Sequence, residues 1–392
     1  MKQYLIVTTN YWAFTLTDGA LRMLVVLHFH GLGYSPLEIA FLFLFYEFFG
    51  IVTNLLGGWL AARVGLNRTM NAGLAIQIVA LSMLLVPVSW LTVAWVMVAQ
   101  ALSGIAKDLN KMSAKSAIKL LVKDDNQRGL YKWVAALTGS KNALKGLGFF
   151  MGGALLTLFG FKVAILSMAI ALSLICLFSI FLLKNDLGRA KSKPKFTQIF
   201  SKTPAINVLA GARFLLFGAR DVWFVVALPV YLIVNMGWSS SFVGAFLAAW
   251  VIAYGLVQSL APMITGVKQA TVPSGLSVVV WALVLGVITA LITVAMFYDV
   301  NPLYGLLPGL LVFGAVFAVN SSVHSYLIVS YASSEHVSMD VGFYYMANAA
   351  GRLLGTVLSG LLFQQYGLTA CLVASASFIF LSSAIALKLP RA

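Results

Sequence analysis

The stretch Thr138-Gly139-Ser140-Lys141-Asn142-Ala143-Leu144-Lys145-Gly146-Leu147-Gly148 places two lysines inside an apolar segment that contains no acid. The segment runs from about Trp133 to Phe159, and a helix needs about 20 such residues to cross a bilayer. Lys141 and Lys145 share one helix face, and a lysine at mid-membrane costs about 2.5 to 3.5 kcal/mol. Each lysine therefore either neutralises a carboxylate of another helix or contributes to an anion site.

The same helix face continues through Gly148 and Gly152, one and two turns later. Successive small residues on one face allow a neighbouring helix backbone to approach closely. We therefore predict a tightly packed helix against this glycine groove.

The composition is that of a polytopic membrane protein. Of the 392 residues, 61% are hydrophobic and only 9% are charged, whereas charged residues make up about 25% of soluble domains. Cys176 and Cys371 lie in separate apolar stretches, which predicts no disulfide framework, no metal site and no cofactor. The formal charge of +15 belongs mainly to loops, so we expect no nucleic acid partner. The first apolar run continues for a full span, as a permanent helix does and a cleaved signal does not.

Apolar windows predict an all-α protein with twelve transmembrane helices. The expected spans are residues 5–29, 36–61, 70–87, 90–111, 133–158, 163–183, 205–234, 241–265, 275–298, 303–330, 340–364 and 368–387.

Basic residues gather in alternate loops and so predict the topology. One side has only Lys162, whereas the other has Arg63, Arg68, Lys115, Lys119, Lys123, Arg128, Lys132, Lys184, Arg189, Lys191, Lys193, Lys195, Lys202, Lys268, Lys388 and Arg391. By the positive-inside rule, both termini are expected in the cytoplasm. A lysine recurs at every fourth residue, at Lys115, Lys119 and Lys123. This spacing predicts the solvent-exposed side of an amphipathic surface, and the alternative is a surface that attracts an anionic substrate.

The basic stretch 184–203 contains Pro194 and separates two groups of six spans. We therefore expect an N-terminal bundle at 1–183, a cytoplasmic linker at 184–203 and a C-terminal bundle at 204–392. A shift of 207 residues aligns Lys145 with Arg352 and also aligns three glycine pairs, Gly148 with Gly355, Gly153 with Gly360 and Gly160 with Gly367. Four matches in register predict a duplicated six-helix unit.

Ionisable residues are absent from the third, sixth, ninth and twelfth spans. The first, second, fourth, fifth, seventh, tenth and eleventh spans carry the candidates Asp18, Arg22, Glu47, Lys107, Asp108, Lys141, Lys145, Arg213, Arg220, Asp221, His324 and Arg352. Because charges in a membrane must face protein or water, this distribution predicts four lipid-facing helices and a polar cavity lined by the rest.

Among the residues just named, seven fixed cations outnumber four carboxylates. Sequence spacing predicts an Arg22–Asp18 pair, and neighbouring acids could satisfy Lys107 and Arg220. Arg213 lies near the end of its span, where snorkelling is an open alternative. The remaining cations would suit an oxyanion such as phosphate, arsenate or carboxylate, which arginine can bind bidentately. The candidate substrate-binding residues are Arg22, Lys107, Lys141, Asn142, Lys145, Arg220, Asn320, Asn348 and Arg352.

Four residues are candidates for proton coupling, namely Asp18, Glu47, Asp221 and His324. Glu47 has no cation near it in sequence, although a salt bridge to Lys141 or Lys145 is the alternative. His324 follows Asn320 and Ser321, and we favour a hydrogen-bonded packing role for it over proton transfer. No cluster of catalytic residues is recognised, so the sequence does not predict an enzyme.

The stretch Gly58-Trp59-Leu60-Ala61-Ala62-Arg63-Val64-Gly65-Leu66-Asn67-Arg68 resembles the loop signature of the major facilitator superfamily. Gly58, Arg63, Gly65 and Arg68 fit that signature as gating-loop residues. Ala62 stands where the family has aspartate, which puts the family's gating salt bridge in doubt. The resemblance implies a transporter of this superfamily. From the charge distribution we predict alternating access, in which Lys141, Lys145 and Arg352 would hold the substrate.

At finer grain the chain resembles the ArsJ family of arsenic-resistance efflux permeases. The resemblance rests on the opening stretch and on the runs 10–23, 43–50 and 104–116, which read NYWAFTLTDGALRM, FLFYEFFG and GIAKDLNKMSAKS. It implies export of 1-arseno-3-phosphoglycerate. We predict that proton antiport drives this export across a bacterial inner membrane. The resemblance also implies glyceraldehyde-3-phosphate dehydrogenase as the functional partner that makes this substrate. The charges alone fit an organophosphate importer or exchanger equally well.

Overall fold

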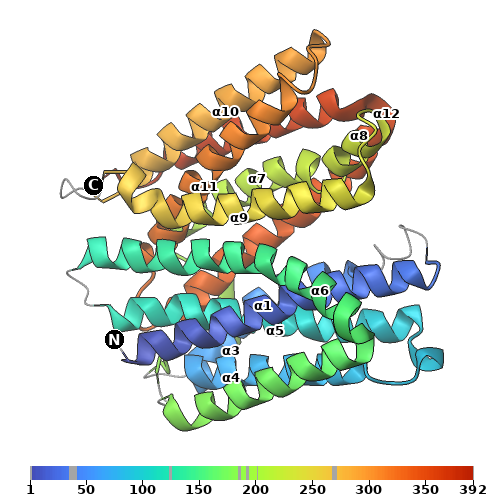
Figure 1. The fold of residues 1–392 in the computed structure, drawn as a ribbon. Coiled ribbons are helices and arrows are strands. Elements are labelled where there is room, and N and C mark those ends of the chain that lie inside the picture. The colour runs from blue at the N-terminus through green and yellow to red at the C-terminus, as the bar shows by residue number, and fades with distance from the viewer. Residues whose placement is uncertain are drawn as a thin grey trace. The chain divides into compact units, whose positions relative to one another are not determined.

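The computed structural model describes residues 2–34, 42–122, 126–183, 187–190, 194–200, 202–266 and 272–391, and these form helices without a strand. The helices are α1 (Lys2–Gly31), α3 (Leu44–Val64), α4 (Leu66–Met83), α5 (Val93–Leu121), α6 (Gln127–Leu182), α7 (Pro204–Phe224), α8 (Ala227–Val234), α9 (Ser240–Ile264), α10 (Gly275–Phe297), α11 (Leu306–Tyr331) and α12 (Val337–Ala386), together with the short 3-10 helices η1 (Val88–Trp90) and η2 (Phe196–Phe200) (Figure 1).

The predicted spans correspond to these helices. Residues 205–234 form α7 and α8 in succession, and the start of the span expected at 36–61 lies outside the described residues. α6 and α12 each contain two predicted spans, which meet at Gly160 (φ 74°) and Gly367 (φ 76°). Glycine adopts a positive φ readily, so it can reverse the chain there without steric strain. The paired glycines at 160 and 367 are thus equivalent turns, and the all-α fold is confirmed.

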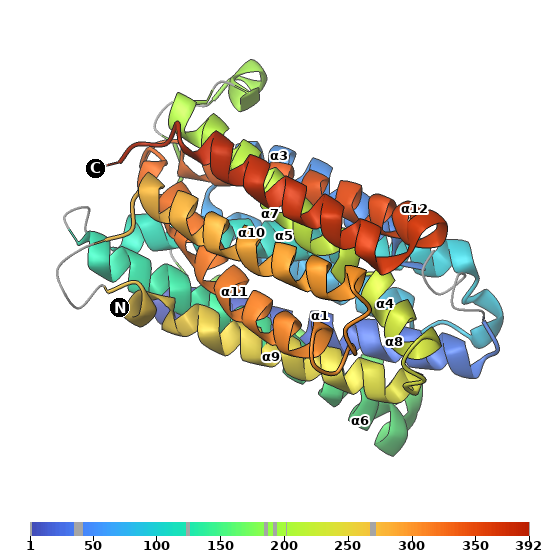
Figure 2. The same cartoon turned by 90° about the horizontal axis from the view of Figure 1, so that it is seen from above.

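Contacts divide the chain into two compact units. Unit 1 consists of Met1–Asp125, Ser140–Ser201 and Ala332–Met346, whereas unit 2 consists of Asn126–Gly139, Lys202–Tyr331 and Ala347–Ala392. Each unit is built mainly from one sequence half and includes a short segment of the other half. In unit 2, α11 packs between α9 and α10 (Figure 2). In unit 1, α5 packs against both α3 and α4.

The predicted glycine groove on α6 packs against α1, as expected. A Cβ atom added to Gly148 would lie 2.7 Å from the backbone oxygen of Leu16, and one added to Gly152 would lie 2.4 Å from that of Ala20. From the other side, a Cβ on Gly19 would lie 2.7 Å from the backbone oxygen of Lys145. Only glycine permits this approach, which places Lys145 at a closely packed helix contact.

Unit 2 repeats this packing between α7 and α12. A Cβ added to Gly355, the repeat partner of Gly148, would lie 2.5 Å from the backbone oxygen of Gly218 in α7. A Cβ on Gly351 would lie 2.0 Å from the backbone oxygen of Phe214. Gly148 and Gly355, which the repeat aligns, therefore have a common packing role.

Gly355→Ala is expected to destabilise the protein by about 1 to 3 kcal/mol, because α7 and α12 must separate to admit the methyl group. The apparent melting temperature of the purified chain, followed by tryptophan fluorescence at a fixed scan rate, measures this effect. Gly360→Ala in the same helix is the matched control, since its Cβ would meet no atom within 4 Å. Equal melting temperatures for the two variants would contradict the packing argument.

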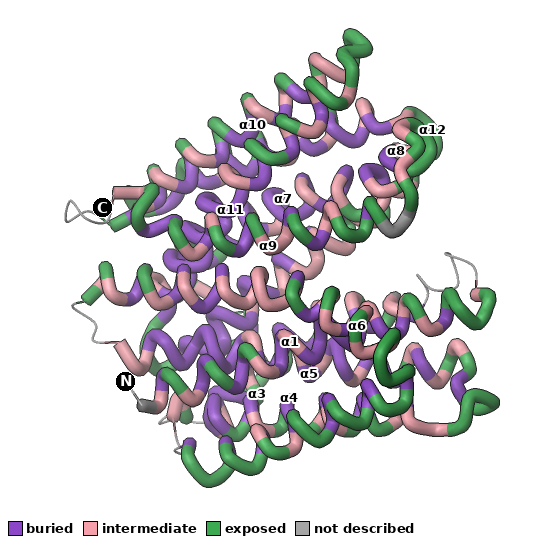
Figure 3. The backbone as a smooth tube through the Cα atoms, viewed as in Figure 1, coloured by how far each residue is buried: buried purple, intermediate pink, exposed green. Residues whose placement is uncertain are grey.

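Exposed large hydrophobic residues are most frequent in part of the helices that lack charge. Figure 3 shows where exposed residues lie along the backbone. α10 and the second part of α6 carry the densest runs, with Phe297 70% and Phe181 82% exposed. α4 is different. Val79 is the one large hydrophobic residue of α4 that is exposed, and α4 packs against α5 along most of its length. The third span is therefore more enclosed than the prediction of four lipid-facing helices implies.

Candidate functional site

In unit 1, α1 and α3 bring together two of the candidate carboxylates and an arginine. Arg22 Nη2 lies 3.0 Å from Glu47 Oε1, and the Tyr46 hydroxyl donates to Asp18 at 2.8 Å. The expected Arg22–Asp18 pair is thus replaced by Arg22–Glu47, because α3 presents a carboxylate to the guanidinium and a hydroxyl to Asp18. Glu47 is accordingly salt-bridged, and Arg22 is one of its partners.

Tyr46 is the central residue of this cluster. The Arg22 guanidinium lies 3.9 Å from the centre of its ring, and the Lys107 ammonium lies 3.8 Å from it. Cations are attracted to the faces of aromatic rings, so the buried tyrosine stabilises two candidate substrate-binding residues. Sequence reasoning assigned Tyr46 no role, although its place beside Glu47 in a run of aromatic residues was the available signal.

Asp108 is buried on α5 between two lysines. Its carboxylate lies 3.7 Å from Lys107 Nζ and 2.5 Å from Lys111 Nζ. The suggested Lys107–Asp108 pair is therefore confirmed, and Lys111 is the closer partner. On α3, a Cβ at Gly50 would lie 2.9 Å from Asp108 Oδ2, so the absence of a side chain there makes room for the carboxylate.

The lysines that follow on α5 correct the prediction of a wet amphipathic surface. Lys115 is buried and donates to the hydroxyl of Tyr345, and Lys119 is also buried. The physical reason is that α5 continues to Leu121, ten residues beyond the predicted span, and packs inside unit 1. Lys123, the third member of the series, lies outside the described residues.

The two lysines of the opening stretch lie side by side on α6. Lys141, Asn142 and Lys145 are each partly exposed within unit 1. The Lys145 ammonium lies 5.9 Å from the centre of the Phe149 ring, one turn further along the helix. Trp12 of α1 donates its indole N–H to Ser140 at 2.8 Å, which fixes α6 just before Lys141.

In unit 2, α7 and α12 build a cluster around one carboxylate. Asp221 is fully buried, with Arg220 Nη2 2.5 Å from its Oδ1 and Arg352 Nε 2.9 Å from its Oδ2. The suggested Arg220–Asp221 pair is confirmed. The sequence did not predict that Arg352, a candidate substrate ligand, shares the same carboxylate.

Arg213 does not snorkel but is buried in unit 2. Its Nε donates to Asn348 Oδ1 at 2.9 Å, and its Nη1 donates to the backbone oxygen and hydroxyl of Ser321 at 3.2 and 3.1 Å. The guanidinium also lies 3.8 Å from the centre of the Phe217 ring. The amide oxygen of Asn348 thus orients Arg213. The sequence predicted Asn348 as a residue that binds substrate and did not predict this contact.

Asn320 and His324 lie one turn apart on α11 and are fully buried. Within the part of the chain that the structure describes, neither the side-chain amide atoms of Asn320 nor the ring nitrogens of His324 have a hydrogen-bond partner. Buried polar groups are usually hydrogen-bonded. The hydrogen bond expected of a packing role for His324 is therefore missing, and the choice between packing and proton transfer stays open.

The predicted gating loop forms the turn between α3 and α4. Gly65 has φ 101°, a conformation that favours glycine, and it ends α3 and begins α4. A Cβ on Gly58 would lie 2.5 Å from the backbone oxygen of Ser338, which belongs to the same unit. Arg63 lies over the ring of Trp59, with its guanidinium carbon 4.8 Å from the centre.

The topology prediction remains untested. Several of its basic residues lie outside the described residues, namely Lys123, Lys184, Lys191, Lys193 and Lys268. By length and composition, six of the described helical segments could each cross a membrane.

Comparison with known proteins places this geometry in a family. Residues 4–289 match the model of the Major Facilitator Superfamily, whereas no curated protein matches the chain. Among solved structures, the human organic anion transporter MFSD10 (TETRAN) is similar with a TM-score of 0.74 and 16% identity over 98% of this chain and 100% of that one. The proton:xylose symporter XylE has a TM-score of 0.76 and 12% identity over 98% and 95% of the two chains.

A bacterial homologue of the iron transporter ferroportin, in an outward-facing state, has a TM-score of 0.75 and 15% identity over 99% of both chains. At these identities the three structures show the fold alone. The family match covers well over half of the chain and includes the Gly58 to Arg68 signature. The chain therefore belongs to the major facilitator superfamily and is a multi-pass membrane protein with the fold of its transporters.

Proposed function

We propose that this chain is a secondary active transporter that exports a small phosphorylated organic anion by alternating access. The observation that carries the proposal is the surplus of arginine over carboxylate in unit 2. In α7 and in the part of α12 that belongs to unit 2, Arg213, Arg220 and Arg352 stand against one carboxylate, that of Asp221. A carboxylate shared by two guanidiniums leaves positive charge that a phosphate or arsenate group could neutralise.

Unit 1 supplies the second part of the argument. Lys141 and Lys145 lie on one partly exposed face of α6, in a segment whose own residues include no acid. The contact of α6 with α1 is built from glycines and holds this face in place. We propose these lysines, with Arg220 and Arg352, as the cations that bind the substrate. Asn142 and Asn320 are the proposed neutral donors, and Arg22 and Lys107 are further contacts.

The substrate that we propose is 1-arseno-3-phosphoglycerate, whose export would confer arsenate resistance. Support comes from the resemblance of residues 10–23, 43–50 and 104–116 to ArsJ permeases, and from a charge surplus that fits a doubly anionic ligand. The transport of organic anions by a structural neighbour, MFSD10, favours the same class of substrate. Glyceraldehyde-3-phosphate dehydrogenase would supply the substrate in the cytoplasm. We propose that both termini of the chain also lie in the cytoplasm.

Proton antiport is the proposed driving reaction, with Asp18, Glu47, Asp221 and His324 as the candidate carriers. A structural neighbour, XylE, is a proton-coupled symporter, which favours proton coupling in general. The second candidate function is an importer or exchanger of organophosphates. The same cation surplus favours it, because phosphate and arsenate have similar charge and geometry.

Uptake of labelled arsenate into everted membrane vesicles separates these functions. We expect accumulation only when the dehydrogenase, NAD and glyceraldehyde 3-phosphate are all present, because the arseno-ester is then formed outside the vesicle. Vesicles without this protein are the control. Accumulation of arsenate in the absence of the dehydrogenase, NAD and glyceraldehyde 3-phosphate would indicate an inorganic oxyanion pump. No accumulation of arsenate, combined with uptake of labelled phosphoglycerate, would make the organophosphate carrier the correct function.

A further inference from the structure

The ring of Phe217 in α7 contacts two arginine side chains. The Arg213 guanidinium lies 3.8 Å from the ring centre, and the Arg220 guanidinium lies 4.8 Å from it. Arg213 precedes Phe217 by about one helical turn and Arg220 follows it by about one turn, so the two cations reach the ring from opposite directions along the helix. The proposed transport mechanism uses Arg220 and assigns no role to Phe217.

Other helices of unit 2 hold this ring in place. Phe217 is buried, and its ring meets the fully buried ring of Phe317 in α11 edge to face, with the centres 5.1 Å apart. Arg213, the other cation on the ring, donates from its Nε to Asn348 of α12 at 2.9 Å. Contacts with α11 and α12 therefore fix the surface against which Arg220 lies.

The contacts of Arg220 leave part of its guanidinium open to a ligand. Its Nε donates to Asp221 Oδ1 at 2.6 Å, and its Nη2 lies 2.5 Å from the same oxygen. The ring contact with Phe217 uses none of the N–H donors of the guanidinium. Nη1 has no hydrogen-bond partner among the residues that the structure describes, and the side chain is 17% exposed. The Nη1 edge is therefore the part of Arg220 that can bind an anion.

An aromatic ring stabilises a buried cation without cancelling its charge. A carboxylate in place of the Phe217 ring would neutralise Arg220 and would occupy the N–H groups that a phosphate or arsenate needs. The ring does neither. Arg220 can therefore remain inside a membrane helix, where a charge is costly, and still attract an anion.

Unit 1 contains the same kind of arrangement. The centre of the buried Tyr46 ring lies 3.9 Å from the Arg22 guanidinium and 3.8 Å from the Lys107 ammonium. The Tyr46 hydroxyl donates to Asp18, which holds this ring in place. One buried ring thus contacts two cations in each unit, and three of these four cations are proposed substrate contacts. The recurrence favours a role for the rings in the substrate site over incidental packing.

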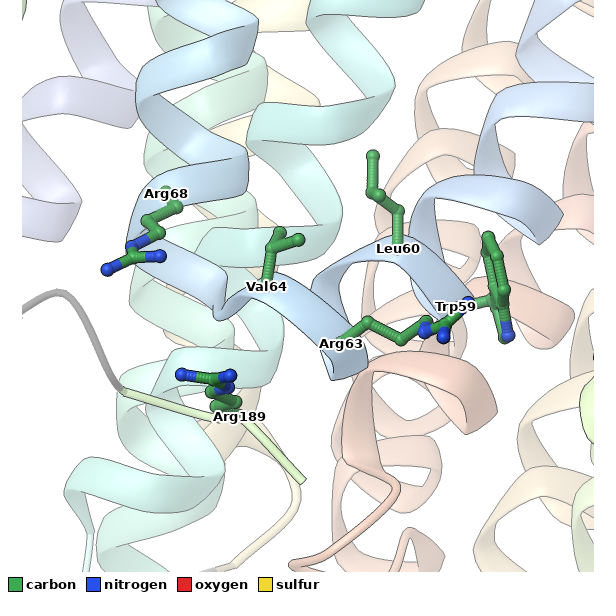
Figure 4. A pocket seen from close by; sticks show the side chains of 6 residues that line it. All are labelled: Trp59, Leu60, Arg63, Val64, Arg68 and Arg189. Atoms are coloured by element: carbon green, nitrogen blue, oxygen red, sulfur yellow. The ribbon is translucent and has the colours of Figure 1, made fainter. Parts of the chain in front are cut away.

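A ring contact alone does not make a binding site. Arg63 lies over the ring of Trp59 in a pocket of about 370 Å³ at the turn between α3 and α4. Figure 4 shows that Arg63 extends toward Trp59 and away from Arg68 and Arg189, so the arginines of this pocket do not converge. In unit 2, by contrast, the two proposed substrate arginines meet at one carboxylate.

We propose that Phe217 is a positioning residue of the substrate site, which holds the Arg220 guanidinium so that its Nη1 edge meets a phosphate or arsenate oxygen. The inference rests on the proposed function, because it takes Arg220 as a substrate ligand. Phe217 acts through Arg220 and makes no contact with the substrate itself. The ring fixes one side of the guanidinium, and Asp221 fixes the edge formed by Nε and Nη2.

The test is the binding of 3-phosphoglycerate, a stable phosphorylated organic anion, to the purified full chain by isothermal titration calorimetry. Phe217 is replaced by phenylalanine that carries one, two or three fluorine atoms on its ring. Fluorine withdraws electron density from the ring face with little change of shape, so the attraction for a cation weakens stepwise. We expect the Kd to rise with each fluorine. Phe217→Leu, which removes the ring, should raise the Kd about tenfold.

The same fluorinated residues at Phe313 are the matched control. Phe313 is also buried in unit 2 and stacks on Phe317, but no cation lies over its ring among the described residues. These replacements should leave the Kd unchanged. A constant Kd across the Phe217 series, with normal binding by the unmodified chain, would overturn the positioning role and leave the proposed function intact. Absence of 3-phosphoglycerate binding by the unmodified chain would overturn both.

A second comparison shows whether Phe217 acts through Arg220. Arg220→Gln should weaken binding by itself, and the fluorinated Phe217 series in that background should then cause no further rise in the Kd. Perturbations of one shared interaction do not add, whereas independent ones do. A rise of equal size with and without Arg220 would show that the ring affects binding by another route, and it would overturn the inference.

Discussion

Lys145→Gln is expected to abolish substrate-dependent uptake into everted vesicles while the amount of protein in the membrane stays the same. The ammonium of Lys145 lies on a partly exposed face of α6, whereas its backbone oxygen lies against Gly19 of α1. Glutamine keeps the helix and the backbone contact but removes the charge. A charge-assisted hydrogen bond to a phosphate is worth about 1.5 to 3 kcal/mol, so transport should fall by at least tenfold.

Lys162→Gln is the control for this prediction. Lys162 lies in the same element, two residues after the turn at Gly160, and its side chain is exposed. The substitution is chemically identical and should leave uptake unchanged. Lys145→Arg, which keeps the charge, should retain part of the activity. Normal uptake by Lys145→Gln at normal protein levels would exclude Lys145 from the substrate site.

Features that repeat along the chain were predictable from the sequence alone. Gly160 and Gly367 mark equivalent turns because a positive φ selects glycine wherever it occurs. Gly148 and Gly355 mark equivalent helix contacts because a close backbone approach excludes a side chain. Both signals depend on the residue type at one position, so neither requires knowledge of which distant helix is the partner.

Charge pairing was predictable only between near neighbours. The pairs Lys107–Asp108 and Arg220–Asp221 follow from adjacency and are present. The Arg22–Asp18 prediction failed although the spacing was suitable, because α3 supplies Tyr46 and Glu47 as better placed partners. The geometry of a helix is contained in its own sequence, whereas competition from a second helix depends on packing.

The burial of Arg213 was missed for a related reason. A charged residue near the end of a span is compatible with snorkelling, and nothing nearby in the sequence argues against it. Its partners Asn348 and Ser321 are more than 100 residues away and neither is charged. A neutral amide and a hydroxyl give no sequence signal that a buried arginine needs them.

Asp221→Asn is expected to destabilise the protein by about 3 to 5 kcal/mol, the usual effect of removing one partner from a buried ion pair. Asp221 is fully buried and accepts from Arg352 on α12 while it pairs with its neighbour Arg220. Asparagine has nearly the same shape but cannot neutralise either guanidinium. The apparent melting temperature in detergent measures the effect, and Asp299→Asn is the control because Asp299 is exposed in a turn.

A second substitution separates electrostatic from steric causes. In the Asp221→Asn background, Arg352→Gln removes one of the two uncompensated charges and should restore part of the lost melting temperature. The same Arg352→Gln change in the unmodified chain should lower the melting temperature, since Asp221 then loses a partner. Effects that simply add would show that the Asp221–Arg352 pair is not energetically coupled. If Arg352→Gln instead lowers the melting temperature of the unmodified chain and raises that of Asp221→Asn, the ion cluster is a stabilising link between α7 and α12.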